Sequence, residues 1–335
     1  MEFDRPNRPA TLRPVGRSVH ALQARRPAAL RPHPVIEVIA GGRWTTIQDR
    51  GRPGLERFGI PPGGAADWFA ARIANELVGN LPDAALLECT ATGPTLRFDV
   101  DRIVAVTGGQ VDSAADWQAV RVARGSSLAI GMIAPGLRTY VAVRGGIDVP
   151  VVLGSRSFCQ LGTFGGGFGR PLAAGDRLPI GRMFGHELVV EPWPPSHRLP
   201  LQGPWEVHVI AGPQIDAFTG DALERLAATA CRVTPEIDRM GLRLKSPGLR
   251  LQSQEILTVP MTAGAIQVTP SGGLIVLHVD HQTTGGYPVI ATVVGADLAL
   301  LAQARPGDTV RFRAVDPAEA ARAARRLTDW LHRES

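Results

Sequence analysis

Cysteine, lysine and aromatic residues are scarce in this chain of 335 residues, which has three cysteines, one lysine and 5% aromatics. Cys89, Cys159 and Cys231 are odd in number and far apart, which excludes a disulfide framework and indicates reduced thiols. No apolar run approaches the roughly 18 residues that a membrane helix needs, and no signal-peptide core follows the first charges. These absences predict a soluble, cytoplasmic protein without a membrane partner.

Common signatures of nucleotide, metal and hydrolase chemistry are also missing. The only lysine, Lys245, follows no glycine-rich loop, so there is no Walker A motif, and no GxGxxG lies between a strand and a helix. CxxC, HExxH and GxSxG are absent. His278 and His281 are three residues apart and would point to opposite faces of a strand, so we expect no metal site. If ATP or NAD is used, no common motif of this chain binds it.

Positive charge is confined to the beginning of the chain. Residues 1–34 hold seven arginines against Glu2 and Asp4, which is the whole net charge of +5. The remaining residues carry 29 basic and 29 acidic side chains. A neutral body is a poor candidate for nucleic-acid binding, because that affinity comes mainly from neutralised phosphates. Six prolines and no apolar period predict that residues 1–34 are a disordered basic tail, or sequence upstream of the true start.

The tetrapeptide VIAG occurs at Val38–Gly41 and again at Val209–Gly212, and each copy opens the same ordered series. The first series has a predicted helix at 67–78, then PTLRF (94–98), TGG (107–109), YVAVRGGIDVP (140–150) and AAGDRLPI (173–180). The second has a predicted helix at 220–228, then PGLRL (247–251), TAG (262–264), IVLHVDHQTTGGYP (275–288) and RPGDTVRF (305–312). Five matches in one order indicate a tandem duplication, and a period this long indicates two related domains.

The composition predicts a mainly β fold. Short apolar runs separated by glycine, proline and aspartate are spaced as in a sandwich or barrel. We expect a first domain at 35–190, a Pro-rich linker at 191–204, a second domain at 205–315 and a C-terminal helix at 316–335. Asp67 is expected to cap the first helix. In the last helix, Asp316, Pro317 and Glu319 predict a capping box, and an apolar stripe, expected to fold back onto the second domain, comprises Leu327, Trp330 and Leu331.

The turn-rich segment 49–64 predicts a long functional loop. Its beginning, Gln48 to Gly54, joins an amide, the carboxylate of Asp49 and two guanidiniums. Arg50 and Arg52 suit a carboxylate, bicarbonate or phosphate, which a guanidinium binds through two hydrogen bonds. The alternative is that both arginines are ordinary surface residues.

Two further groups of charged residues stand out. Glu88 and Thr90 lie in the apolar run ALLECT, where a carboxylate is either paired or has a raised pKa that suits a proton carrier. Asp238 and Arg239 precede a glycine in DRMG, and they indicate either a reactive acid–base pair or an internal ion pair.

The segment QTTGGYP after His281 gathers polar groups around two glycines. Gly285 and Gly286 allow close approach of a ligand to the backbone. The other side chains offer hydrogen bonds, namely those of Gln282, Thr283, Thr284 and Tyr287. The alternative is a tight hairpin with polar tips.

Several of these segments together resemble the biotin-dependent carboxyltransferase, or allophanate hydrolase subunit 2, family. They are TTIQDRGRPG, residues 75–98, AVRGGIDVPVVLGSRS, DRMG, GAIQV, HQTTGGYPVI and LLAQARPGDTVRF. Within the family the chain is most similar to the C subunits of bacterial ATP-dependent 5-oxoprolinases, also described as kinase-inhibitor antagonists. The likeness runs from about residue 35 to 312. Two positions depart from the family pattern. Phe158 stands where a small residue is common, and His281 stands where the family usually has an arginine, whose charge a protonated histidine could partly supply.

The resemblance implies two tandem cyclophilin-like β-barrel domains with a few packed helices. It also implies two partners, a kinase-inhibitor-like B subunit and a lactam-utilisation-like A subunit, which together with this chain open 5-oxoproline to glutamate with ATP. In urea carboxylases a similar module transfers carboxylate from carboxybiotin to urea. Here a biotin-carrier lysine motif is missing and 335 residues leave no room for a biotin carboxylase, so biotin is implied by the family name alone. A third alternative is a non-catalytic module that sequesters a kinase inhibitor.

Under the leading hypothesis, ATP with magnesium is shared with the partner subunits, and the lactam is activated by phosphorylation of its oxygen. Such a site must stabilise the charge of the transferring group. The expected catalytic residues are Asp49, Arg50, Glu88, Asp238 and Arg239. The expected substrate-binding residues are Gln48, Arg52, Thr90, Arg156, His281, Gln282, Thr283, Thr284, Gly285, Gly286 and Tyr287. We expect the polar loops that differ between the two copies to face one another across the domain boundary.

Overall fold

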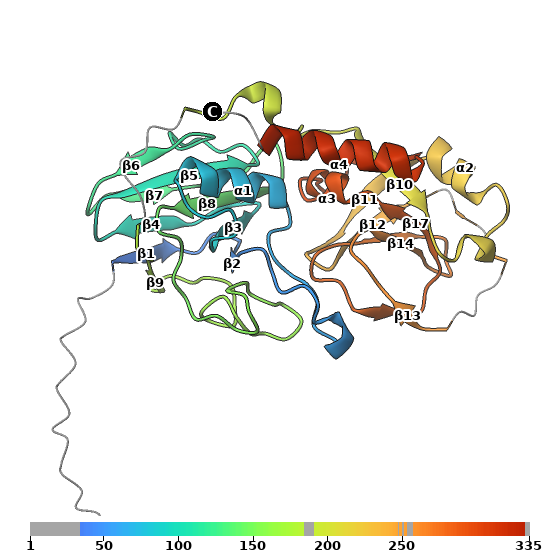
Figure 1. Ribbon diagram of the computed structural model, residues 1–335, viewed down its shortest axis with the longest axis horizontal. Helices are drawn as coiled ribbons and strands as arrows, with labels where there is room; N and C mark the ends of the chain where they lie inside the picture. Colours follow the sequence, from blue (N-terminus) through green and yellow to red (C-terminus); the bar gives the residue numbers. More distant parts are fainter. Residues whose placement is uncertain (1–33, 184–190, 247, 250, 253–256, 332–335) are drawn as a thin grey trace, which may run out of the picture. The chain divides into compact units, whose positions relative to one another are not determined.

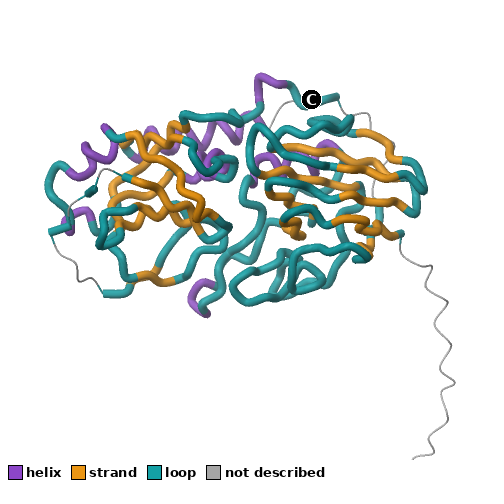
Figure 2. The backbone as a smooth tube through the Cα atoms, turned by 180° about the vertical axis from the view of Figure 1, so that it is seen from behind, coloured by secondary structure: helices purple, strands orange, loops and turns teal. Residues whose placement is uncertain are grey.

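The computed structural model describes residues 34–183, 191–246, 248–249, 251–252 and 257–331. They belong to one compact unit. The mainly β prediction is confirmed, because strands and loops dominate the described chain and helices are few (Figure 2). The predicted tail, apart from Pro34, lies outside the described residues. The predicted domain boundaries stay a prediction.

In the first half of the chain the strands form two sheets. One sheet has the order β7-β4-β1-β9 and the other the order β2-β3-β8-β5-β6 (Figure 1). Buried side chains from both, such as Ile36 of β1 and Val141 of β8, belong to one hydrophobic cluster, so the sheets enclose a common core. The strands are β1 Val35–Ala40, β2 Trp44–Gln48, β3 Leu86–Thr90, β4 Thr95–Phe98, β5 Arg102–Gly108, β6 Val120–Val122, β7 Ser127–Ala129, β8 Arg138–Val143 and β9 Arg177–Pro179.

In the second half seven strands close into a barrel of order β10-β17-β14-β15-β12-β11-β18. Closure leaves these strands without an exposed edge. Trp205 and Phe312 belong to the buried cluster inside the barrel. The strands are β10 Trp205–Ala211, β11 Ala230–Ile237, β12 Gly241–Lys245, β14 Ala265–Val268, β15 Leu274–Leu277, β17 Val289–Val293 and β18 Thr309–Ala314, and a separate short pair joins β13 Val259–Pro260 to β16 Thr284–Gly285.

The duplicated segments occupy corresponding strands but pair differently. The two VIAG copies fall on β1 and β10, which open their halves. β1 runs antiparallel to β9, whereas β10 runs parallel to β18. The second PGLRL copy lies partly outside the described residues. The halves are thus related in sequence order without being identical in strand pairing.

Helices cover the strands at few places. They are α1 Trp68–Leu77, α2 Ala222–Ala228, α3 Leu298–Leu301 and α4 Pro317–Leu331, with one-turn 3-10 helices η1 Glu56–Phe58, η2 Pro195–His197, η3 Ile215–Ala217 and η4 Gly295–Asp297. Asp67 caps α1 as predicted, because its carboxylate accepts a hydrogen bond from the Ala70 N–H at 2.9 Å. The helix buries Phe69, Ile73 and Leu77 and packs on β5 and β8.

The C-terminal helix α4 begins as predicted but packs more widely than expected. The Asp316 carboxylate accepts from the Glu319 N–H at 2.7 Å, while the Glu319 carboxylate pairs with Arg313 instead of completing a capping box. Leu327 is buried, and the Trp330 ring lies 6.1 Å from the Phe69 ring of α1. Because α4 also contacts β10, it packs on both halves and not on the second barrel alone. In the described part of the chain, none of the helices has the length and apolarity required to span a membrane.

A third hydrophobic cluster forms where the two halves meet. It joins α1 and the outer face of β8 to α4 and to Val294, Ala296 and Ala299 of the second half. Every residue of β8 is buried, with Val141 in the first core and Tyr140 in this third cluster. The strand therefore carries a phenol into the contact between the halves.

Candidate functional site between the two halves

Four charged side chains form a buried cluster between the halves, with exposures from 0% for Asp280 to 3% for Arg138. Arg239, from the turn between β11 and β12, donates from Nε to Asp280 Oδ2 at 2.8 Å and from Nη1 to Glu88 Oε1 at 2.5 Å. Its Nη2 also donates to the Gly64 carbonyl at 2.7 Å. Arg239 thus links β3 and the 49–64 loop of the first half to the second half. The carboxylates that it pairs with are Glu88 and Asp280, and not its neighbour Asp238.

Two alternatives were open for Glu88, a paired carboxylate or a carboxyl group with a raised pKa, and the structure shows a paired carboxylate. Its Oε2 accepts hydrogen bonds from the Ala66 N–H at 2.8 Å and from the Tyr140 hydroxyl at 2.9 Å, and Arg138 Nε lies 3.9 Å from Oε1. Burial alone would raise the pKa of Glu88, but the charges of Arg239 and Arg138 and the hydrogen bonds hold it below the usual value. The carboxylate therefore stays ionised at neutral pH, which does not suit a proton carrier.

A second carboxyl group, Asp67, lies in the same network. The buried Gln303 donates from Nε2 to Asp67 Oδ2 at 2.7 Å, and its Oε1 accepts from the backbone N–H groups of Leu137 and Arg138 at 3.0 Å each. Burial raises the pKa of Asp67 to about 6, against the hydrogen bonds from Ala70 and Gln303 that favour the ionised form. Asp67, with a pKa of about 6, thus lies in the same network as Glu88, which stays ionised.

A cleft of about 630 Å³ opens beside the buried cluster. This volume is within the range of roughly 300–1,000 Å³ that is usual for small-molecule sites. Its walls carry four guanidiniums against one carboxylate, which favours an anionic ligand. The lining residues are Arg43, Trp44, Thr90, Ala91, Leu137, Arg138, Gln160, Pro235, Ile237, Asp238, Arg239, Arg305 and Pro306.

The charged groups of the cleft differ in how far they are already engaged. Arg305 donates from Nη1 to the carbonyls of Ile133 and Gly136 at 3.1 Å each. Asp238 Oδ1 accepts from the N–H groups of Met240 and Gly241. Arg43 is exposed, and within the described chain its guanidinium has no hydrogen-bond or ion-pair partner. It is the cleft cation most available to a ligand.

The structure brings part of the predicted site together. Thr90, Asp238 and Arg239 line the cleft, and Glu88 lies buried behind it. The Gly63 N–H donates to the Val279 carbonyl at 2.9 Å, so the 49–64 loop contacts the turn that carries Asp280 and His281. His281 is buried, and its Nδ1 lies 2.7 Å from the Gln282 carbonyl oxygen. The two polar loops face one another here, as we expected.

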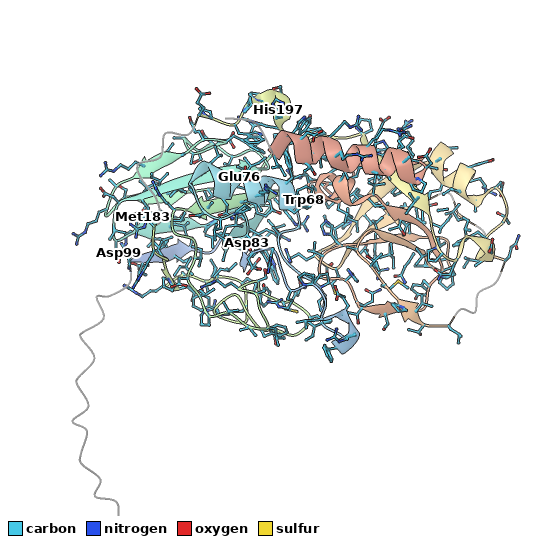
Figure 3. The ribbon with its side chains drawn as sticks, viewed as in Figure 1. Trp68, Glu76, Asp83, Asp99, Met183 and His197 are labelled. Atoms are coloured by element: carbon cyan, nitrogen blue, oxygen red, sulfur yellow. The ribbon has the colours of Figure 1, made fainter. Side chains whose placement is uncertain are left out.

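Three predicted residues lie away from this cleft, along a separate groove of about 780 Å³. The Asp49 carboxylate accepts four hydrogen bonds, from the hydroxyls of Ser155 and Ser157 and the backbone N–H groups of Gly51 and Arg156. The Arg156 guanidinium pairs with Asp148 at 2.7 Å. Arg50 is exposed and 3.7 Å from Asp83, whose position Figure 3 marks. Asp49 therefore orders its loop, and none of the three joins the cleft residues.

The QTTGGYP segment also lies outside the cleft lining. Thr284 and Gly285 form β16, and the Thr283 carbonyl accepts from the Met261 N–H at 2.9 Å. Gln282 donates to Gln267 Oε1 at 3.1 Å. A Cβ on Gly285 would lie 2.6 Å from Gln267 Nε2, so a side chain there would displace this buried amide. A Cβ on Gly286 would only be in ordinary contact with Thr258 Oγ1 at 3.8 Å, and Tyr287 is exposed. A substrate-binding role for these residues stays a prediction.

Several cluster and cleft residues were missed by the sequence reasoning. Tyr140 and Gln303 interrupt the apolar runs YVAV and LALLAQA, and a buried polar group in such a run needs a partner, which was an available signal. Arg138 begins the buried strand β8 and Asp280 follows β15, and both residues carry a weaker signal. The local sequence around Arg43 carries no signal of a functional role.

The comparisons with known proteins agree with this architecture. The family model for the carboxyltransferase domain, subdomains A and B, matches residues 58–314, and the chain belongs to that family. It is 36% identical over 285 residues to the 5-oxoprolinase C subunit of Escherichia coli, covering 83% of this chain and 90% of that protein. It is also 34% identical to the urea amidolyase of Lachancea kluyveri, covering 83% of this chain and 17% of the longer protein.

The solved structures support the fold. The crystal structure of the Kluyveromyces lactis urea amidolyase matches with a TM-score of 0.83 and 30% identity, covering 90% of this chain and 20% of that chain. The predicted family and fold class are confirmed. The relatives are subunits or parts of enzymes.

Proposed function

We propose that this chain is one subunit of an ATP-dependent 5-oxoprolinase, which converts 5-oxoproline, ATP and water into glutamate, ADP and phosphate. The supporting observation is the share of each relative's length that this chain matches. The chain spans 90% of a 5-oxoprolinase C subunit but 17% of a urea amidolyase. On this likeness to a C subunit, we propose that it acts with a kinase-inhibitor-like B subunit and a lactam-utilisation-like A subunit.

The charge of the cleft suits the difficult step of this reaction. A lactam carbonyl is resonance-stabilised, and transfer of a phosphoryl group to its oxygen makes the ring carbon more electrophilic. The transferring group is negative, and fixed guanidiniums at its position stabilise the transition state. In this proposal Arg43 and Arg305 face the phosphoryl group and Thr90 contributes a hydroxyl on the cleft wall.

Arg239 and Glu88 have a different role in this proposal. Arg239 is held by two carboxylates and a carbonyl, so most of its donors are engaged. We propose that the pair acts as positioning residues, which fix the 49–64 loop and β3 against the turn that carries Asp238.

ATP with magnesium is proposed to be shared with the partner subunits. Guanidiniums fit phosphate oxygens, but Mg²⁺ prefers carboxylate and water oxygens. Among the described cleft residues Asp238 is the one carboxylate, and one of its oxygens already accepts two backbone hydrogen bonds. We therefore propose that the protein ligands of the metal come from a partner.

The second candidate function is a carboxyltransferase acting on urea or a related amide. The family model and the structural match to a urea amidolyase favour it. In that case carboxybiotin, carried by another protein, would be the carboxylate donor, and the same cationic cleft would face the carboxylate.

Reconstitution separates the two candidates. The chain is purified alone and with the two partner subunits encoded in its own genome, and ATP hydrolysis is measured with and without 5-oxoproline. We expect 5-oxoproline-dependent hydrolysis in the reconstituted sample. Its absence from both samples contradicts the first proposal, and urea-dependent decarboxylation of carboxybiotin supports the second.

A further inference from the structure

Arg52 is a buried cation whose donors are mostly unused. Its side chain is 3% exposed, and Nη2 donates to the Ser157 carbonyl at 2.5 Å. Neither Nε nor Nη1 has a hydrogen-bond partner among the residues that the structure describes. Buried polar groups are almost always hydrogen-bonded, so a guanidinium with two idle nitrogens needs an explanation.

The neighbouring carboxylates compensate the charge of Arg52 only in part. Asp280 acts on it but is already held by Arg239 through both oxygens, and the Asp49 carboxylate already accepts four hydrogen bonds, one from Gly51 of its own loop and three from residues 155–157. Burial lowers the pKa of Arg52, which reflects the unfavourable environment of the charge. An unpaired buried charge is strongly destabilising, and an anion bound at the guanidinium would remove that penalty.

An aromatic ring and two glycines lie next to the guanidinium. The Phe164 ring covers one face, with Cζ 5.0 Å from the ring centroid. A Cβ on Gly63 would lie 3.5 Å from both Arg52 Nη1 and Asp280 Oδ1, and a Cβ on Gly165 would lie 3.3 Å from Nη2. Side chains at these two glycines would therefore contact the guanidinium.

An unused acceptor lies along the same stretch of backbone. Gln48 is 0% exposed and its Nε2 lies 3.4 Å from the Phe158 carbonyl, next to the Ser157 carbonyl that Arg52 contacts. Its Oε1 has no partner within the described chain. Two residues further on, Gln160 lines the 630 Å³ cleft. The unpartnered donors of Arg52 and the unpartnered acceptor of Gln48 therefore belong to two side chains that contact consecutive carbonyls of the same backbone segment.

We propose that Arg52 and Gln48 form a subsite for a small carboxylate that carries an adjacent N–H group. The two carboxylate oxygens would accept from Arg52, and the N–H would donate to Gln48 Oε1. A carboxylate on the carbon next to a lactam nitrogen, as in 5-oxoproline, has this arrangement. In naming 5-oxoproline the inference rests on the proposed function, whereas the carboxylate subsite does not.

Direct binding to the purified full chain tests the subsite. The probes are L-5-oxoproline, 2-pyrrolidinone, which is the same lactam without the carboxylate, and acetate, which lacks the N–H. Calorimetric titration gives the dissociation constants. We expect 5-oxoproline to bind most tightly and 2-pyrrolidinone at least about tenfold more weakly, because a charge-assisted hydrogen-bonded pair is lost.

Variants locate the site on Arg52. Arg52→Gln is expected to weaken 5-oxoproline binding at least about tenfold, and Arg52→Lys to have a smaller effect because the charge remains. Arg57→Gln, an exposed arginine of the same loop, is the matched control and is expected to bind as the wild type does. Without ligand, the Tm of Arg52→Gln should equal or exceed that of the wild type, since an unpaired charge is removed; an arginine with a merely structural role would lower it.

Three results would each overturn the subsite. The wild type could bind 5-oxoproline and 2-pyrrolidinone equally well, it could bind neither 5-oxoproline nor acetate, or Arg52→Gln could keep the wild-type affinity. Acetate binding that depends on Arg52, without 5-oxoproline binding, supports the subsite and contradicts the proposed substrate. Unchanged KM for 5-oxoproline in a reconstituted Arg52→Gln complex supports the proposed function and contradicts the subsite.

Discussion

Arg239 pairs with two buried carboxylates at the contact between the halves. It is 2% exposed and satisfies Asp280 of its own half together with Glu88 and the Gly64 carbonyl of the other. Burial would lower the pKa of this guanidinium, but the two carboxylates raise it above its usual value. The residue is fixed in its charged form.

Removal of that guanidinium should be strongly destabilising. We expect Arg239→Met to lower the free energy of unfolding by about 3–5 kcal/mol, because two buried carboxylates lose their partner. Denaturant titration measures the loss. Arg243→Met, at an exposed position of β12 in the same barrel, is the control, and a loss for Arg239→Met no larger than that of the control would contradict the account.

Asp67 should make stability depend on pH in the opposite sense to most carboxylates. Its pKa is raised from 3.8 to about 6 by burial. Since the unfolded chain releases this proton at lower pH, the folded state binds more protons between about 4 and 6, and its stability falls as pH rises through that window. As pH rises through this window, the unfolding free energy of the wild type should fall relative to that of Asp67→Asn by up to about 3 kcal/mol.

The measurement is denaturant unfolding of both proteins from pH 4 to pH 7. Asp221→Asn, at the exposed start of the corresponding helix α2, is the matched control. A wild-type-minus-variant difference that stays constant across the window for Asp67→Asn would refute the assignment.

At the residue scale the sequence indicated some groups and not their partners. Glu88 and Arg239 were both identified as paired or reactive groups, because each is a charge in an unusual local context. Nothing in the local pattern indicated that they pair with each other, since 151 positions separate them. The same applies to Gln303, whose partners Asp67 and Arg138 are 236 and 165 positions away.

Among the elements, α4 has the clearest consequence for the fold. It contacts β10 and η4 of the second half, while Trp330 lies 6.1 Å from Phe69 and 5.4 Å from His197. The helix therefore holds elements of both halves together through one apolar stripe.

The stripe can be tested at its most buried large side chain. We expect Leu327→Ala to lower the free energy of unfolding by about 2 kcal/mol or more, because buried methyl groups are removed and a cavity remains. Arg326→Ala, the exposed neighbour, is expected to change it by less than about 0.5 kcal/mol. Thermal or denaturant unfolding measures both, and equal effects would show that α4 does not pack as described.

Local signals predicted the elements better than their pairing. Asp67 and the apolar spacing after it predicted α1, and Asp316 with Pro317 predicted the start of α4, because caps and periodicity act within a few residues. The antiparallel β1–β9 pair and the parallel β10–β18 pair arise from segments that occupy corresponding places in the two copies. Strand pairing depends on long-range packing, which the repeat does not encode.

At the scale of the whole molecule, the cleft between the halves has an exposed arginine at its surface and buried, ion-paired side chains at its inner end. Arg43 is available to a ligand, whereas Arg138 and Arg239 are held beside Glu88. The two halves thus build the scaffold, and residues that differ between the two copies of the repeat, such as Arg239, lie at the contact between them. This arrangement is what the proposed phosphoryl-transfer chemistry requires.

The central claim, that this chain provides the cleft for 5-oxoproline activation, is tested most directly by kinetics of the reconstituted complex. The rate of 5-oxoproline-dependent ATP hydrolysis is compared for the wild type, Arg43→Gln and the control Arg124→Gln, which alters an exposed arginine outside the cleft. We predict that Arg43→Gln lowers kcat/KM at least about tenfold with unchanged Tm, and that Arg124→Gln matches the wild type. No 5-oxoproline-dependent hydrolysis in the wild-type complex, or full activity in Arg43→Gln, would contradict the claim.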